Sequence, residues 1–500
     1  MKLVLEDHAD FVIVGSGAGG ATAARVLSEA GLSVIVLEEG PALPPSARSE
    51  GLIDAMDESL RDMGTVATTG RTPIPLLMGR CVGGSTAVNS GIIWRLPSDV
   101  QHDWSTRLGL HELVDEKTLD RNFARIETDL GVTEVREDML GGNAKRLRAA
   151  SEALGLPGRA IRRNAQQCKG SARCLQGCPN AARQSMDVSY IPQAITHGTR
   201  VHALSHARRV LFERGRAAGV AGDVLDPGTR RPVGRFRVVA SRGVIVAAGA
   251  VYTPALLWNS GLRGRVGEGF QAHPGAAVVG QFPDSVGMGF GATQSYEVPL
   301  RERGYKLESL ALPPELLAAR LPGAGRSWQR DLQHLDRFAQ FCAVHRAAAR
   351  GRVRPTTFGD VAVRYELLQS DFDRVKQSVA LLVRMMFAAG AIEVYPGVAS
   401  VPERLTRPEQ AELIVGPQVR RQDFHLLASH HFGSAAAGTS RDHSVVSSTL
   451  EAHDAPNLYV MDASALPTNL GVNPQHTIMA VVYGAAERLA NRERNSRNAA

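Results

Sequence analysis

Residues 11–20 read FVIVGSGAGG, four apolar residues that pass directly into a glycine-rich turn. Residues 21–30 (ATAARVLSEA) contain good helix formers, and Gly31 ends that segment. Residues 33–37 (SVIVL) form a second apolar run, which ends at Glu38. A strand, a helix and a second strand in this order predict a βαβ unit with two parallel strands.

The glycine-rich turn has the spacing of a dinucleotide-binding loop. Gly15 permits the tight turn, Gly17 lets a pyrophosphate approach the backbone, and Gly20 lets the helix pack on the strands. The free N–H groups of the helix then face the phosphates. Glu38 follows Gly15 by 23 residues, where a carboxylate binds a ribose hydroxyl and disfavours the 2′-phosphate of NADP. This unit alone does not distinguish FAD from NAD as the dinucleotide. The alternative to a dinucleotide site is a glycine-rich turn that binds no ligand.

Length and composition exclude several classes of protein. The chain has 500 residues, more than one core of ~250–300 residues holds, so we expect two domains. The net charge of +7 comes with arginines scattered among acids, which argues against a nucleic-acid partner. No apolar run approaches the ~18 residues of a membrane span. The first residues include acidic side chains, whereas a signal peptide has an apolar stretch there. We therefore expect a cytoplasmic protein without a transmembrane segment.

A second glycine-rich loop, GRCVGGSTAVNSG over residues 79–91, could wrap a flat polar ring system with its backbone amides. It resembles the first signature of the glucose-methanol-choline (GMC) oxidoreductases, which are FAD enzymes. Residues 249–261 (GAVYTPALLWNSG) resemble the second signature, and His273-Pro274 ends a similar segment. Residues 430–434 (HHFGS) and 462–477 resemble the carboxyl-terminal active-site block. The resemblance runs from about residue 10 to residue 490 and is weakest over residues 276–424.

The resemblance implies an α/β fold in which discontinuous segments assemble a Rossmann-like FAD-binding domain. We expect this domain over residues 1–275 and 425–490, and an α+β substrate-binding domain over residues 276–424. Within the second domain, residues 276–282 read as a strand, and residues 313–321 and 327–350 read as helices. We expect a last helix over residues 477–490 and a frayed polar tail over residues 491–500.

The resemblance also names the cofactor as FAD and places its contacts. The residues expected to bind it are Gly15, Gly17, Gly20, Glu38, Gly84, Asn89, Gly91, Asp462, Ala463, Asn473 and Pro474. Some relatives attach the flavin through a histidine just before the asparagine of the first signature. Val88 stands at that position here, so we expect non-covalent FAD.

Oxidation of an alcohol needs a base for the hydroxyl proton, and histidine has a suitable pKa. The catalytic histidine of the family corresponds to His430, and a second active-site residue eleven positions after Asp462 corresponds to Asn473. We interpret His431 and His476 as core histidines. Residues 435–438 read AAAG where many relatives have Cys-Arg-Met-Gly, a departure near the site.

Three cysteines, Cys168, Cys174 and Cys178, gather in the loop over residues 166–180. Some bacterial relatives that pass electrons to a cytochrome subunit carry an iron–sulfur cluster in this region, so a cluster here stays an alternative. The sequence offers no obvious fourth ligand. We therefore expect a compact loop with reduced thiols and no metal.

The resemblance implies oxidation of an alcohol to a carbonyl, with hydride transfer to the flavin and oxygen or another electron acceptor. Residues 304–314 resemble the long-chain alcohol oxidase branch, so we expect a hydrophobic or aromatic alcohol. Two alternatives stay open. One is a flavin-dependent lyase or decarboxylase on the same fold, and the other is an electron-transfer subunit of a dehydrogenase complex.

Overall fold

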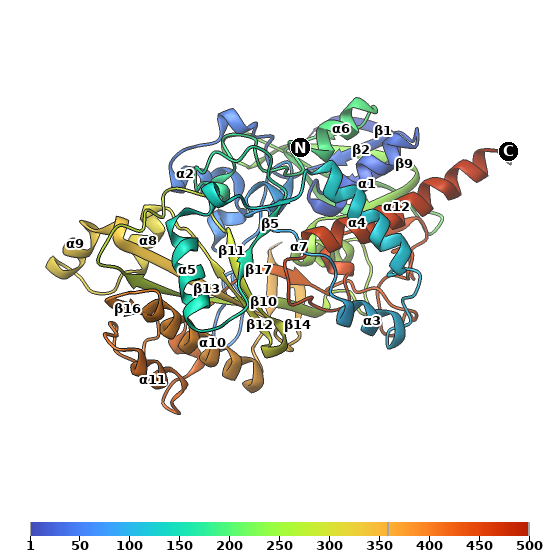
Figure 1. The fold of residues 1–500 in the computed structure, drawn as a ribbon. Coiled ribbons are helices and arrows are strands. Elements are labelled where there is room, and N and C mark those ends of the chain that lie inside the picture. The colour runs from blue at the N-terminus through green and yellow to red at the C-terminus, as the bar shows by residue number, and fades with distance from the viewer. Residues whose placement is uncertain (1, 358–359, 499–500) are drawn as a thin grey trace.

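The computed structural model of the protein describes residues 2–357 and 360–498. Two β-sheets with surrounding helices dominate it, and both ends of the chain lie on the side of the first sheet (Figure 1). This mixed α/β architecture confirms the predicted fold class.

The first sheet has the strand order β6-β2-β1-β9-β8-β7, and β18 pairs with the end of β9. Strand β1 pairs in parallel with β2 and β9, β2 with β6, and β18 with β9, whereas β7, β8 and β9 form an antiparallel meander. The bounds are β1 Leu3–Val14, β2 Val34–Leu37, β6 Arg200–His202, β7 Ser205–Glu213, β8 Arg216–Leu225, β9 Pro232–Val246 and β18 Leu458–Val460.

The predicted βαβ unit is the centre of this sheet. Its helix is α1 (Ala18–Glu29), and Val12 pairs with Ile35 across the two parallel strands. The last helix of the chain, α12 (Gln475–Asn498), packs against α1 and against α4 (Glu116–Asp129). Strand β18 and helix α12 bring the carboxyl-terminal block back to the first βαβ unit, so this part of the fold is discontinuous in sequence.

The second sheet has the order β15-β14-β10-β13-β12-β11-β4, and both β16 and β17 also pair with β10. Helices α5 (Gly141–Ala153) and α10 (Gln369–Ala388) pack on it, and α7 (Gly249–Asn259) contacts strands of both sheets. The bounds are β4 Arg159–Ala160, β10 Glu268–Gln281, β11 Tyr296–Leu300, β12 Tyr305–Ser309, β13 Phe338–His345, β14 Gly351–Pro355, β15 Val361–Arg364, β16 Glu393–Tyr395 and β17 Leu427–Phe432.

Shorter elements complete the described chain. They are α2 Leu52–Ser59, α3 Ser98–Thr106, α6 Tyr190–Thr196, α8 Pro314–Arg320, α9 Arg326–Leu332, α11 Glu412–Val415, and a small sheet of β3 Thr133–Glu134 with β5 Arg162–Arg163. Across residues 2–357 and 360–498, the structure contains no helix long and apolar enough to cross a membrane.

Two predicted helices differ in the structure. The helix expected over residues 327–350 ends at Leu332, and β13 follows at the centre of the second sheet. The residues of β13 (FAQFCAVH) include Phe and Val, which favour strands, and nearly every one of them is buried between neighbouring strands. The last helix does not end at residue 490 but continues to Asn498. Residues 491–498, which were expected to fray, are therefore helical. Residues 499–500 lie outside the described part of the chain.

The sheets do not follow the proposed domain boundaries. The boundary at residue 275 falls inside β10, and β17, which was assigned with the FAD-binding segments, belongs to the second sheet. Strand β4 also joins the second sheet. The division into two domains stays a proposal, with residues 268–275 and 427–432 on the border between them.

Candidate active site

The first glycine-rich turn joins β1 to α1 and leaves room beside the helix N-terminus. Gly15 has a φ of +99°, which an L side chain rarely adopts. A Cβ on Gly20 would lie 1.9 Å from the carbonyl oxygen of Gly15, so the helix can pack this closely only with glycine there. A Cβ on Gly17 would meet no atom within 4 Å, and no side chain caps the helix. The turn therefore presents backbone N–H groups to open space, as an anion site requires.

Glu38 lies buried beside this turn and connects it to the second glycine-rich loop. Its Oε2 accepts hydrogen bonds from the backbone N–H (3.0 Å) and hydroxyl (2.7 Å) of Ser16. Ser16 Oγ in turn accepts from the backbone N–H of Gly83 at 2.9 Å. Burial raises the pKa of Glu38. The two glycine loops approach so closely that a Cβ on Gly84 would lie 3.0 Å from the Cα of Gly17.

The rest of the second loop is held by polar contacts that the sequence did not reveal. Asn89 Oδ1 accepts from the backbone N–H of Gly91 at 2.8 Å, and its Nδ2 donates to Gln475 Oε1 at 2.7 Å. The buried guanidinium of Arg183 donates to the carbonyl oxygens of Ala87 and Asn89. The loop is therefore tied to the start of α12, where Pro474 precedes Gln475.

Asp462 follows β18, and its carboxylate is used within the protein. Its Oδ2 accepts from Thr253 Oγ1 at 2.5 Å and from the backbone N–H of Gly249 at 2.8 Å. Its Oδ1 accepts from the backbone N–H of Ser464 at 2.7 Å. Burial raises the pKa of Asp462. The carboxylate thus fixes the start of α7 and the turn at Ala463. A cofactor bound here would contact the backbone of that turn and not the carboxylate of Asp462.

His430 lies on β17 opposite an irregularity in its pairing with β10. Ala272 pairs with His431 and Pro274 pairs with Ala428, so two residues of β17 stand opposite one residue of β10. Such a bulge turns a side chain out of the regular alternation. Here it places His430 Nδ1 3.1 Å from His273 Nδ1.

The environment of His430 keeps its imidazole neutral. Its packing in the protein, together with the positive charge of Lys306, lowers the pKa of His430 to about 3. Burial and the neighbouring His430 hold the pKa of His273 well below its ordinary value. Both rings are therefore neutral near neutral pH, and each carries one ring proton.

Asn473 stands on the other side of His430. Its Nδ2 lies 3.4 Å from His430 Nε2, and its Oδ1 accepts from Lys306 Nζ at 2.6 Å. Because an ammonium group can only donate, the atom of Asn473 at Lys306 must be the oxygen. The amide N–H groups of Asn473 consequently face His430, and the structure brings the two predicted active-site residues together.

The other two histidines lie elsewhere. His431 is buried on the opposite side of β17, with Nε2 3.2 Å from the carbonyl oxygen of Ala428 and its ring stacked on Phe270. His476 is buried at the start of α12 and packs against Phe123 of α4, with ring centroids 4.6 Å apart. The ring contacts of both histidines are with residues of the packed core.

Ser16, His273, Lys306 and Gln475 support the site, and sequence reasoning missed the roles of all four. His273 stood in a recognised motif, and Lys306 alternates with Glu308 in an otherwise apolar segment. That alternation, typical of a strand with charges on one buried face, was the available signal for Lys306. Ser16 and Gln475 carried no such signal because their partners are distant in sequence.

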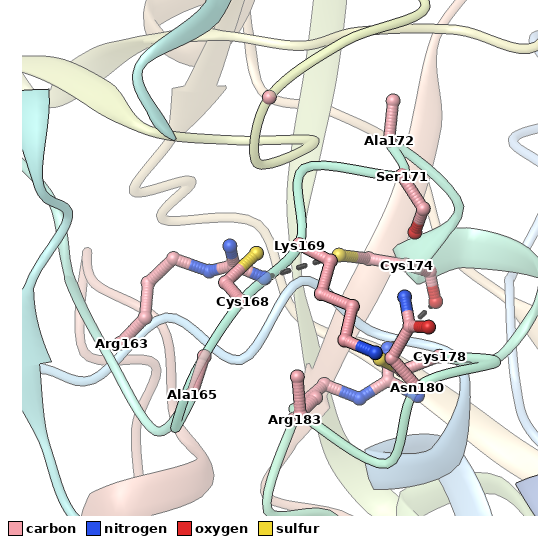
Figure 2. A pocket seen from close by; sticks show the side chains of 12 residues that line it. Arg163, Ala165, Cys168, Lys169, Ser171, Ala172, Cys174, Cys178, Asn180 and Arg183 are labelled. Carbon is pink, nitrogen blue, oxygen red and sulfur yellow. Dashed lines mark hydrogen bonds between the residues drawn. The ribbon is translucent and has the colours of Figure 1, made fainter. Parts of the chain in front are cut away.

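The cysteine loop lines a small cavity together with Arg163 and Arg183 (Figure 2). Arg163 Nη2 donates to Cys174 Sγ at 3.1 Å. Although burial opposes ionisation, Arg163 and Arg183 lower the pKa of Cys174 to about 7. In the part of the chain that the structure describes, no group of three or more histidine, cysteine or acidic side chains is placed to hold a metal ion. The arrangement gives no support to an iron–sulfur cluster.

Known proteins resemble this chain over nearly its whole length. An uncharacterized GMC-type oxidoreductase of Mycobacterium tuberculosis is 36% identical over 96% of this chain and 75% of its own length. Another from Sinorhizobium fredii is 34% identical over 97% of this chain and 95% of its own. A long-chain-alcohol oxidase of Arabidopsis thaliana is 28% identical over 96% of this chain and 66% of its own.

Solved structures share the fold at low sequence identity. A formate oxidase of Aspergillus oryzae, studied for FAD modification, aligns with a TM-score of 0.73 and 16% identity over 98% of this chain and 100% of its own. A pyridoxine 4-oxidase aligns with a TM-score of 0.70 and 16% identity over 96% and 98% of the two chains. Family models described as GMC oxidoreductase match residues 9–275 and 347–481. The chain therefore belongs to the GMC oxidoreductase family.

Proposed function

We propose that the protein binds FAD without a covalent bond and oxidises a hydrophobic or aromatic alcohol to a carbonyl compound. The observation that carries the proposal is the approach of His430 Nε2 to Asn473 Nδ2 at 3.4 Å, in a chain of this family. The 28% identical long-chain-alcohol oxidase supports the substrate class.

The residues present fit FAD. The N-terminus of α1 offers uncapped N–H groups beside open space at Gly17, which suits a pyrophosphate. Glu38 lies at the end of β2, where a ribose is expected, and the loop over residues 84–91 adjoins the same turn. Val88, which is buried, has no nucleophilic side chain for a covalent link.

The chemistry of the pair is complementary to an alcohol. A hydroxyl placed between the two side chains would accept a hydrogen bond from Asn473 Nδ2 and donate its proton to His430 Nε2. As that proton leaves, negative charge grows on the substrate oxygen, and the Asn473 amide stabilises it. Bound FAD supplies the acceptor for the hydride from the alcohol carbon. Because burial and Lys306 lower the pKa of His430 to about 3, its ring is neutral, and it can accept the hydroxyl proton at Nε2 when the ring hydrogen lies on Nδ1.

The test is anaerobic titration of the purified protein with fatty, aromatic and sterol alcohols, followed by visible absorbance. An alcohol that bleaches the oxidised flavin supports the proposal. A flavin that stays oxidised with every alcohol would contradict it and would favour a lyase or decarboxylase. Absorbance of an iron–sulfur cluster in the same spectrum would favour an electron-transfer subunit.

A further inference from the structure

Three charged side chains of the hairpin formed by β11 and β12 are buried next to Asn473. Glu297, Lys306 and Glu308 are each at most 1% exposed. Glu297 pairs directly with Glu308 across the hairpin, and Lys306 lies on the same face of β12 as Glu308. Like charges opposite each other destabilise a sheet, and Lys306 relieves this by contacting Glu297 at 3.0 Å and Glu308 at 2.5 Å.

Stability alone does not account for this cluster. Glu297 also accepts from Arg159 Nε at 2.9 Å and from Trp94 Nε1 at 3.0 Å. With Arg159 the cluster holds two positive and two negative charges. Burying ion pairs costs desolvation energy that their attraction often fails to recover, and apolar residues of similar volume are frequently as stable. The arrangement therefore points to a role beyond holding the hairpin together.

The third contact of Lys306 indicates that role. An ammonium group has three N–H donors and no acceptor. Lys306 donates hydrogen bonds to Glu297 Oε2 and Asn473 Oδ1, and it forms an ion pair with Glu308. A reversed Asn473 amide would place its NH₂ group against the ammonium and lose this hydrogen bond. The two glutamates fix Lys306, and Lys306 fixes the Asn473 amide.

We infer that Lys306 is a positioning residue for the alcohol oxidation proposed above: it holds Asn473 so that Nδ2 faces His430 and the substrate oxygen. The inference rests on that proposed function. Lys306 touches neither reacting atom, and its effect passes through Asn473.

The experiment is a double-mutant cycle between Lys306→Met and Asn473→Ala, measured as anaerobic flavin reduction at saturating alcohol. Lys306→Met should slow reduction about 10–100-fold while FAD content and the alcohol concentration at half-saturation change little. In the Asn473→Ala background, Lys306→Met should have no further effect, because the residue it positions is gone. A purely structural role would instead give additive losses, which would overturn the inference.

Two further variants keep the experiment decisive. Lys306→Met with Glu308→Gln restores the net charge of the cluster and replaces the single variant if that variant loses its fold. Loss of fold and FAD in both variants would mean a structural role and would also overturn the inference. Lys376→Met, on α10, is the control for loss of a lysine and should leave reduction unchanged. Failure of wild-type protein to reduce with any alcohol would instead refute the proposed function.

Discussion

His273 and His430 face each other through their Nδ1 atoms at 3.1 Å, so one proton lies between two neutral rings. The backbone N–H of Gly471 contacts His273 Nε2 at 3.0 Å, and the Asn473 amide contacts His430 Nε2 at 3.4 Å. Two neutral imidazoles joined in this way have one proton left for their two Nε2 atoms, so only one Nε2 can accept a hydrogen bond. The N–H groups of Gly471 and Asn473 therefore cannot both donate to the pair at once. For His430 Nε2 to accept a substrate proton, the shared proton must lie on His430 Nδ1 and the second proton on His273 Nε2, at the cost of the Gly471 contact.

The His273 contact predicts how substitutions there affect the reaction. His273→Leu removes the partner of His430 Nδ1, worth roughly 0.5–1.5 kcal/mol, and should slow flavin reduction by about 10-fold or less. His273→Asn keeps a polar atom near the position of Nδ1 and should retain more of the rate. Stopped-flow reduction at equal FAD content measures both. Equal rates for the two variants would contradict a hydrogen-bonding role for His273.

Glu38 is predicted to matter for FAD affinity more than for turnover. Glu38→Ala would remove the proposed carboxylate hydrogen bond to the ribose, worth roughly 1.5–3 kcal/mol, and would leave the Ser16 and Gly40 donors without their partner. The loss is distant from His430, so the rate per bound FAD should change little. Dialysis followed by flavin quantification measures occupancy, and activity is normalised to it. Unchanged occupancy would contradict the assignment.

Val88 predicts that the flavin is released on denaturation. A valine side chain offers no nucleophile for a bond to the flavin, in contrast to the histidine of some relatives. After acid precipitation the yellow colour should remain in the supernatant. Colour retained in the pellet would show a covalent link through another residue.

Buried histidines predict a loss of stability in mild acid. Burial lowers the pKa values of His345, His431 and His476 to about 4 and that of His430 to about 3. These residues titrate near 6.5 in the unfolded chain, so between pH 4 and 6.5 the unfolded state binds more protons. The free energy of unfolding should be highest above about pH 6.5 and fall as the pH drops toward 4.

One substitution isolates a single contribution to this pH dependence. His476→Phe replaces a ring that packs on Phe123 with an apolar ring that takes up no proton. The slope of unfolding free energy against pH should decrease by about one proton in that window. Denaturant unfolding of both proteins at several pH values measures the difference. Identical slopes would mean that His476 is not neutral in the folded protein.

Sequence reasoning reached the parts of the molecule that local signals encode. The βαβ unit follows from apolar runs around a glycine turn, whereas the assignment of Asn473 rests on the family resemblance, which places that residue eleven positions after Asp462. Strand β13 was missed although its Phe and Val residues favour a strand, because its place between β10 and β12 depends on residues distant in sequence. The contact of His273 with His430 depends on a bulge between distant strands, which no local pattern encodes.

The buried cluster at Lys306 illustrates the same limit. Glu297, Lys306 and Glu308 lie within a stretch of twelve residues, yet their contacts depend on the hairpin register that sets Glu297 opposite Glu308. Their link to Asn473 spans 167 residues of sequence. Charged residues in an apolar segment indicate that charged side chains are buried there. Only the packed structure shows that Asn473 is a partner of Lys306.

The catalytic pair is the central claim, and anaerobic stopped-flow reduction of three variants tests it most directly. His430→Ala should slow flavin reduction by about 10²–10⁴-fold with FAD still bound, because the base for the hydroxyl proton is lost. Asn473→Ala should cost about 10–100-fold, from roughly 1–3 kcal/mol for an oxygen left without its donor. His476→Ala, which alters a core contact with Phe123, should be milder than both. If His476→Ala proves the most damaging while His430→Ala is reduced at the wild-type rate, the assignment of the active site is wrong.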